Sequence, residues 1–297
     1  MRFFKQAIIL FYALSLLLLP APSPAGEFDE LSNKADQGYS KAQFNLAEAY
    51  YSGKGTSKNL EHAFFWYEKA AQQGHPKAQR ALGAMYELGK GTAKEPEKAA
   101  YWYFKAAEQG LARAQTNLGI LYETGEGIMQ HYEAAHFWYE KAAVQGYARG
   151  QTYLGRMYEL GIGVAVDFKK AFYWYQKAAV QGYARAQTNL GALYETGQGV
   201  KQNYKKAVVC YTEAADQHYA RGQFYLGRMF QKGFGVEKDL VQVLNWYAKA
   251  AELGHVQARK QLAKMKSEHS NTDAKVEQER QKVSDQPKGD RLTALIH

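Results

Sequence analysis

The chain has 297 residues, of which 46% are hydrophobic and 14% aromatic, so it has ample material for a core. Its one cysteine, Cys210, excludes an internal disulfide, and stability must therefore come from packing. The formal charge of +9 favours acidic partners or anionic membranes, but no basic run or reading motif supports dedicated nucleic-acid binding.

Residues 1–25 have the features of a secretory signal peptide. Arg2 and Lys5 form a positive n-region, an apolar run covers 7–19, and small residues fill much of 20–25. The apolar run is shorter than the roughly 20 residues that a membrane-spanning helix needs. We expect cleavage before Gly26 and export to the periplasm or beyond, which lowers the formal charge to +7. An uncleaved anchor is the alternative.

Residues 41–266 repeat every 36 residues without insertion or deletion. Each unit opens with an amphipathic helix, helix A, which carries Leu at its sixth position and ends at a Gly-x-Gly. A second helix, helix B, follows and is stopped by a glycine such as Gly146. Repeats one to six begin at Lys41, Lys77, Arg113, Arg149, Arg185 and Arg221, and a partial seventh begins at Gln257.

Small and bulky residues recur for packing reasons. Gly119 on helix A and the pair Ala142 and Ala143 on helix B allow close approach of the helix backbones, while Trp138 and Tyr139 fill the space between repeats. A single hairpin cannot bury enough apolar surface to offset the entropy of ordering its residues. The repeats are therefore expected to stack on one another.

The pattern Leu-Gly-x-Leu-Tyr-Glu-x-Gly-x-Gly, followed by Ala-x-x-Trp-Tyr-x-Lys-Ala-Ala-x-x-Gly, resembles the Sel1-like repeat, a relative of the tetratricopeptide repeat. Residues 34–38 resemble the end of a helix B, which would make 26–40 half a unit. The resemblance implies an all-α, right-handed superhelical solenoid of antiparallel helix hairpins, with a concave face lined mainly by helix A. It also implies an adaptor; exported bacterial members often act in envelope assembly or host contact.

Patterns that could carry chemistry have structural explanations. The Gly-x-Gly turns follow no strand and lack a Lys-Ser/Thr ending, so we interpret them as turns rather than phosphate loops. His131 and His136 are spaced to face different directions on a helix, and Cys210 has no sequence-level catalytic partner. The repeated Glu87, Glu123, Glu159 and Glu195 are interpreted as a ladder on helix surfaces. We predict no catalytic residue, no metal site and no cofactor.

Differences between repeats point to a binding site. The fifth position of helix A alternates between Asn and Tyr, and the eighth alternates between Ile or Ala and Arg. Tyr and Arg are frequent binding hot spots, so this pattern predicts a partner-binding surface in the groove. Inherited packing between repeats is the alternative. The predicted partner-binding residues are Asn117, Tyr153, Arg156, Asn189, Tyr225 and Arg228.

Repeat five contains the main irregularity. Cys210 occupies the position that holds Trp in the other five complete repeats, Glu213 replaces Lys, and His218 replaces the glycine that ends helix B. A positive φ at that position would make His cost about 1 kcal/mol relative to Gly. The pattern indicates either compensated drift, with Cys210 as a small buried hydrophobe, or a local pocket or flexible joint near 208–218.

Residues 267–297 lose the repeat. Their polar, highly charged composition indicates a mobile extension with at most a short helix. The predicted function of the whole chain is a non-enzymatic protein–protein interaction scaffold that binds a protein or peptide, not nucleic acid. A cell-wall-directed or β-lactam-binding hydrolase is the alternative, although the family members linked to β-lactams carry a cysteine pair in each repeat. A basic solenoid regulating a membrane complex from an anionic membrane surface is a third reading.

Overall fold

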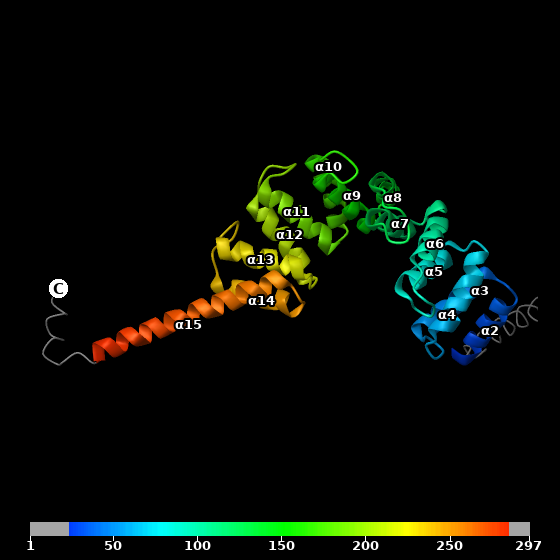
Figure 1. Cartoon of the computed structure of the whole chain (residues 1–297), viewed down its shortest axis with the longest axis horizontal. Coiled ribbons are helices and arrows are strands. Elements are labelled where there is room, and N and C mark those ends of the chain that lie inside the picture. The colour runs from blue at the N-terminus through cyan, green and yellow to red at the C-terminus, as the bar shows by residue number, and fades with distance from the viewer. Residues whose placement is uncertain (1–23, 285–297) are drawn as a thin grey trace, which may run out of the picture. The chain divides into compact units, whose positions relative to one another are not determined.

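The computed structural model describes residues 24–284, and every regular element in that range is a helix (Figure 1). Residues 1–23 of the predicted signal peptide, which was expected to cover 1–25, and the chain after residue 284 lie outside the described residues. The helices are α2 (Pro24–Asp36), α3 (Ser40–Ser52), α4 (Leu60–Gln72), α5 (Pro76–Leu88), α6 (Pro96–Glu108), α7 (Ala112–Thr124), α8 (Tyr132–Val144), α9 (Ala148–Leu160), α10 (Phe168–Val180), α11 (Ala184–Thr196), α12 (Tyr204–Asp216), α13 (Ala220–Lys232), α14 (Leu240–Glu252) and α15 (Val256–Ser284).

The described part of the chain forms two compact units, which divide between Ala142 and Ala143. In the first unit α3 pairs with α4 and α5 with α6, and in the second α9 pairs with α10, α11 with α12 and α13 with α14. Within each unit, helix B of one repeat also packs against helix A of the next, as α4 does against α5 and α12 against α13. The prediction of an all-α solenoid of antiparallel helix hairpins is confirmed.

Glycines end helix A and let neighbouring repeats approach. Gly197 ends α11 with φ 77°, and its N–H donates to the Leu193 carbonyl. Gly199 also has a positive φ of 71°, and a Cβ there would lie 2.2 Å from the Phe168 carbonyl oxygen at the start of α10. A side chain cannot fit at that distance. The Gly-x-Gly pair therefore closes one repeat onto the previous one, which is the turn role expected from the sequence.

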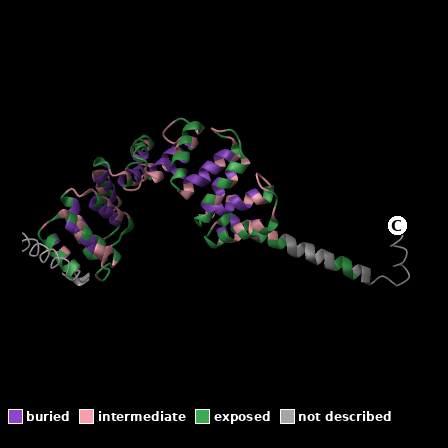
Figure 2. Cartoon of the chain, turned by 180° about the vertical axis from the view of Figure 1, so that it is seen from behind, coloured by how far each residue is buried: buried purple, intermediate pink, exposed green. Residues whose placement is uncertain are grey.

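Buried residues recur along the described helices (Figure 2, purple), and among them is a tyrosine at one fixed position of helix B in each repeat. In repeat four the hydroxyl of buried Tyr175 donates to Glu159 on helix A, at an Oη–Oε2 distance of 2.5 Å. Gly155 lies against the same ring: a Cβ there would be 2.8 Å from its carbons. These buried tyrosines are Tyr67, Tyr103, Tyr139, Tyr175, Tyr211 and Tyr247.

The repeated glutamates are part of this core arrangement. Each accepts a hydrogen bond from the buried tyrosine of its own repeat: Glu87 from Tyr103, Glu123 from Tyr139, Glu159 from Tyr175 and Glu195 from Tyr211. Burial of Tyr175, together with the Glu159 carboxylate, raises the pKa of its phenol well above the ordinary value. The tyrosine therefore stays protonated as the donor. The carboxylates join the two helices of a hairpin rather than only decorating a surface.

A buried glutamine joins successive repeats. The Gln151 side-chain amide donates to the Ala143 carbonyl at the end of the preceding helix B, with an N–O distance of 3.1 Å. The same bond recurs from Gln43 to Ala35, Gln79 to Ala71, Gln115 to Ala107 and Gln223 to Ala215. Because this bond satisfies a buried amide, it fixes the register between neighbouring repeats.

The two ends of the described chain extend the stack. Helix α2 packs against α3, in the manner of a helix B before repeat one. Helix α15 packs against α14 and continues as one helix to Ser284, so much of the segment expected to be a mobile extension is helical. Its Lys, Glu, Gln and Ala residues have high helix propensity, which explains a helix longer than the short one expected. The mobility of this segment stays a prediction.

Candidate functional site

In the second unit the A helices lie closer together than the B helices. Helix α11 contacts both α9 and α13 directly, whereas among residues 143–267 no contact of that extent joins α10 to α12 or α12 to α14. In a curved stack of hairpins, the layer with the closer helices lies on the inner side of the curve. Side chains on α9, α11 and α13 therefore share one inner surface.

Tyr153 on α9 lies at the centre of a group of arginines. The guanidinium carbons of Arg149, Arg156 and Arg185 lie 5.7, 5.3 and 5.4 Å from its ring centroid. Arg185, which comes from the next A helix, also donates to the Tyr153 hydroxyl at 3.3 Å. Cation–π contacts and this hydrogen bond hold several positive charges around one aromatic ring.

Tyr225 on α13 has the equivalent position two repeats later. Arg221 and Arg228 lie 5.5 and 4.6 Å from its ring centroid. The Tyr225 ring also stacks on the ring of Tyr211: the two ring centroids are 5.1 Å apart and the ring planes are inclined by only 12°. The Nη2 of Arg228 lies 2.6 Å from both carboxylate oxygens of Glu195, which also accepts from Tyr211 at 2.8 Å. A network thus links α11, α12 and α13.

These side chains form a basic surface, which we call the Tyr/Arg surface. It consists of Arg149, Tyr153, Arg156, Arg185, Arg221, Tyr225 and Arg228, and all of them keep some solvent exposure. Two carboxylates, Glu159 and Glu195, act on its arginines, so positive charge dominates. Burial by itself would lower the pKa of Arg149, but its hydrogen bond to Tyr153 raises it. Guanidinium groups held in this way can bind carboxylates through paired N–H donors.

The structure separates the predicted site residues into two kinds. Tyr153, Arg156, Tyr225 and Arg228 lie together on the second unit and are half-buried. Asn189 is only 7% exposed, and its side-chain amide acts on the Tyr175 phenol of the preceding repeat, where it partly offsets the rise in the pKa of that phenol. Asn117 acts in the same way on Tyr103, within the first unit. The two asparagines therefore serve packing between repeats, and the binding role of all six residues stays a prediction.

Three arginines of the surface were missed by the sequence-based site prediction. Arg149, Arg185 and Arg221 are the first residues of repeats four, five and six, and the sequence pattern assigned them no binding role. A signal was present, because Arg149 and Arg221 each precede a Tyr by four residues, the spacing of neighbours on one helix face. The contribution of Arg185 to Tyr153 crosses between repeats and has no such local signal.

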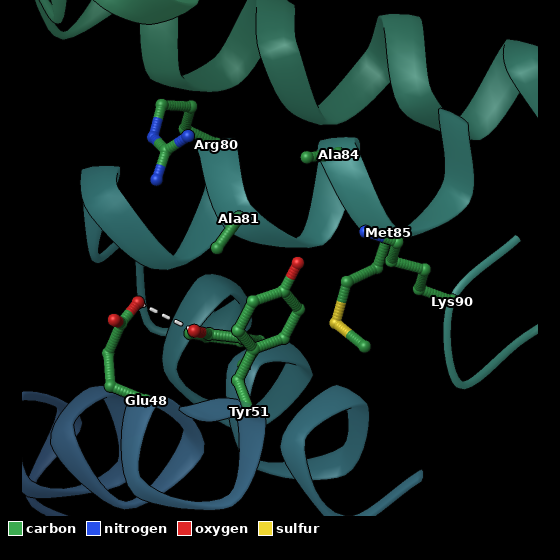
Figure 3. Close-up of a pocket in the computed structure, with 8 residues that line it drawn as sticks. Glu48, Tyr51, Arg80, Ala81, Ala84, Met85 and Lys90 are labelled. Atoms are coloured by element: carbon green, nitrogen blue, oxygen red, sulfur yellow. Dashed lines mark hydrogen bonds between the residues drawn. The ribbon is translucent and has the colours of Figure 1, made fainter. Parts of the chain in front are cut away.

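The first unit has a different arrangement at the corresponding positions (Figure 3). Tyr67 donates to Glu48 at 2.6 Å, because Tyr51 occupies the position that holds Glu in repeats two to five. Glu48, Tyr51, Arg80 and Lys90 take part in lining a pocket of about 280 Å³. The lining thus combines one carboxylate with two cations.

Three histidines, which could in principle bind a metal or act in catalysis, instead cap helices. His75, His131 and His255 accept, through Nδ1, the N–H three residues later, and so cap helices α5, α8 and α15. In the described part of the chain, no three His, Cys, Asp or Glu side chains gather as a metal site would require. None of the described helices is both long enough and apolar enough to cross a membrane.

Comparison with known proteins gives a consistent result. The Sel1 repeat family model matches six consecutive segments, residues 40–75, 76–111, 112–147, 148–183, 184–219 and 220–255. A Sel1 repeat protein from Oxalobacter formigenes has a similar structure, with 36% identity and a TM-score of 0.71; the match covers 82% of this chain and 70% of that one. No curated protein matched the chain significantly.

A second similar structure is that of a protective antigen present in uropathogenic Escherichia coli strains, which displays an SLR fold. It shares 36% identity with this chain at a TM-score of 0.72. The match covers 79% of this chain but 50% of the antigen, so the chain spans about half the antigen's length.

Proposed function

The chain belongs to the Sel1 repeat family, whose members generally mediate protein–protein interaction, and on this premise we propose that it is an exported, non-enzymatic scaffold. Its partner is a protein or peptide with an acidic segment, bound on the Tyr/Arg surface of the second unit. The setting is envelope assembly or contact with a host. The likeness to a protective antigen supports a setting at or outside the cell surface.

The observation that carries the proposal is the gathering of five arginines, from the three successive A helices α9, α11 and α13, around Tyr153 and Tyr225. Tyr and Arg are enriched among residues that dominate binding energy. A basic surface also attracts an acidic partner over distance and accelerates encounter. The inner side of a solenoid lets one extended or helical segment touch several repeats at once.

The surface is also organised before binding. Arg228 is held by Glu195 and by the Tyr225 ring, and Arg185 by the Tyr153 hydroxyl. Long side chains that are already ordered lose less conformational freedom on binding, at about 0.5–1.5 kcal/mol for each one that would otherwise be immobilised. This supports recognition by a rigid surface rather than by folding around the partner.

A footprint by amide hydrogen exchange tests the site. The probe is a fluorescein-labelled peptide of alternating Glu and Tyr, which supplies the proposed chemistry without the natural partner. We expect slower exchange in α9, α11 and α13 than in α10, α12 and α14, and binding that weakens as salt is raised. Protection confined to the B helices, or affinity independent of salt, would contradict the proposed surface.

Export requires its own test, since it concerns residues outside the described range. We expect the mature protein, isolated from the cell that makes it, to begin at Gly26 by intact-mass measurement and to fractionate outside the cytoplasm. A protein that retains residues 1–25 and stays in the cytoplasm would rule out export while leaving the binding surface unaffected.

The hydrolase alternative is disfavoured because the family is generally non-enzymatic. The lone Cys210 also departs from the cysteine pair per repeat of the β-lactam-linked members. Turnover of a β-lactam or of peptidoglycan fragments by the purified chain, lost on mutation of residues in the second unit, would overturn the non-enzymatic assignment.

A further inference from the structure

A pocket opens in repeat five where the other five complete repeats have a tryptophan. Cys210 occupies that position on α12, and a pocket of about 400 Å³ lies between α10, α11 and α12. Its lining includes Leu190, Tyr194, Lys206, Val209, Cys210 and Glu213. All of these residues belong to the second unit. We call this space the Cys210 pocket.

The next repeat supplies an internal comparison. Trp246 stands at the position of Cys210, and the corresponding space there is smaller, about 330 Å³. Leu226, the counterpart of Leu190, belongs to the buried cluster against which Trp246 packs, and it does not line that space. Leu190 is 6% exposed, against 2% for Leu226 and 0% for Leu154. Loss of the indole therefore uncovers apolar core surface that is covered in the other repeats.

Two further changes accompany the missing tryptophan. In repeat four, Tyr173 contacts Trp174 edge-on at 4.9 Å, and the Lys177 ammonium lies 5.0 Å from the Tyr173 ring. Repeats one to three have the same aromatic–Trp–Lys group. Repeat five replaces it by Val209, Cys210 and Glu213. Two rings and a positive charge are thus absent together, and a negative charge stands in the place of the lysine.

The carboxylate of Glu213 is held at the rim of the pocket. The Gln187 amide donates to Glu213 Oε2 at 3.0 Å, whereas its counterparts in the other repeats donate to the alanine carbonyl at the end of the preceding helix B. Ala179, the alanine in question, is 8% exposed, against 1% for Ala215. Lys206 also borders the pocket, but it lies 5.3 Å from the Tyr194 ring, as Lys170 does from Tyr158 in repeat four at 5.0 Å. Of these two charged residues at the rim, Glu213 is the one that differs from the other repeats.

We propose that the Cys210 pocket binds a bulky aromatic side chain, carried beside a lysine or arginine on a protein partner. The aromatic ring would occupy the volume of the missing indole and cover Leu190, and the cation would pair with Glu213. The partner segment thereby restores the group that repeat five lacks. This second site lies between α10, α11 and α12. None of its lining residues belongs to the Tyr/Arg surface, and the site does not depend on the function proposed for that surface.

The test uses the blocked peptide acetyl-Trp-Tyr-Gln-Lys-amide, which copies residues 174–177, and the full mature chain. Methyl resonances report binding by nuclear magnetic resonance. We expect saturable shifts at Leu190 and Val209, with Leu226 and Leu253 around the Trp246 position unchanged. A peptide with Ala in place of Trp should cause no shift. Equal shifts around Trp246, or no saturable shift at millimolar peptide, would overturn the proposal.

Two variants separate the contributions. Cys210→Trp fills the pocket with the chain's own indole and should abolish the shifts, while binding of the acidic peptide to the Tyr/Arg surface stays unchanged. Glu213→Lys lies at the exposed rim and restores the residue of the other repeats. It should weaken the affinity for the Trp peptide about tenfold, which corresponds to about 1.4 kcal/mol of binding free energy. Unchanged peptide binding in both variants would contradict the site. A smaller sedimentation coefficient for Cys210→Trp than for the parent would assign the pocket to a second copy of the chain and overturn the proposed occupant.

Discussion

In the described part of the second unit, Arg228 on α13 and Glu195 on α11 form an ion pair between two A helices. The Nη2 atom of Arg228 lies 2.6 Å from both carboxylate oxygens of Glu195. The Glu195 side chain is 11% exposed and that of Arg228 is 29% exposed, so solvent screens the pair less than a surface bridge. The same carboxylate accepts from Tyr211, and the same guanidinium lies over Tyr225. One ion pair thus joins the core of repeat five to the Tyr/Arg surface.

We expect Arg228 and Glu195 to be energetically coupled. In a double-mutant cycle with Arg228→Ala and Glu195→Gln, the coupling in the free energy of unfolding should be about 1.5–3 kcal/mol, the range for hydrogen bonds to charged groups. Glutamine is a suitable replacement because Gln231 already accepts from Tyr247 in repeat six, at 2.8 Å. Chemical denaturation monitored by circular dichroism measures the cycle. Additive effects would show that the pair contributes no interaction energy.

His218 should be replaceable by glycine with a gain in stability. Among the described residues it is the non-glycine residue with positive φ, 57°, at a position where the other complete repeats have glycine. A side chain costs about 1–2 kcal/mol in this conformation. His218→Gly should therefore raise the free energy of unfolding by about 1 kcal/mol. Gly182→His, the matched change one repeat earlier, should lower it similarly. Equal stability of the parent and His218→Gly would refute the strain.

Gly155 should not tolerate alanine, although alanine is the better helix former by about 1 kcal/mol. A Cβ there would lie 2.8 Å from carbons of the Tyr175 ring. Overpacking of this kind costs about 1–3 kcal/mol. Gly155→Ala should consequently destabilise the chain, and the same change should be neutral or stabilising once Tyr175→Leu has removed the ring. Thermal unfolding of the four proteins distinguishes the clash from helix propensity, which alone would make Gly155→Ala stabilising in both backgrounds.

The thiol of Cys210 should react slowly in the folded chain. Burial, with a further contribution from Glu213, raises its pKa to about 12, so the thiolate that attacks alkylating reagents is scarce at pH 8. Iodoacetamide should modify the native protein at least about a hundredfold more slowly than the unfolded chain, whose cysteine has a pKa of about 8.5. The native rate should keep rising with pH beyond 9. Comparable rates in the folded and unfolded chains at pH 8 would contradict the buried, protonated thiol.

Much of the fold follows from the sequence because one physical pattern repeats. The glycines of the Gly-x-Gly turns and the leucine of helix A recur at a constant interval, so each repeat supports the assignment of the others. The sequence also indicated that His218 occupies a glycine position, and that repeat five could contain a pocket.

The site was harder to predict because its contacts cross between repeats. Asn189 looked like a groove residue, yet it reaches the hydroxyl of Tyr175 in the preceding repeat. Arg185 looked like a marker of the period, yet it bonds to Tyr153, 32 residues earlier. Such pairs depend on how one hairpin is placed on the next. A pattern within one repeat carries no information about that distance.

The most direct test of the central claim compares two double variants in binding to the Glu/Tyr peptide. Tyr153→Ala with Arg156→Ala removes a tyrosine–cation pair from the Tyr/Arg surface. Tyr173→Ala with Lys177→Ala removes a comparable pair, 5.0 Å apart, from helix α10. With folding verified by circular dichroism, we predict at least about a tenfold loss of affinity for the first variant, about 1.4 kcal/mol, and none for the second. Equal affinities of the two variants would contradict the assignment of the Tyr/Arg surface as the binding site.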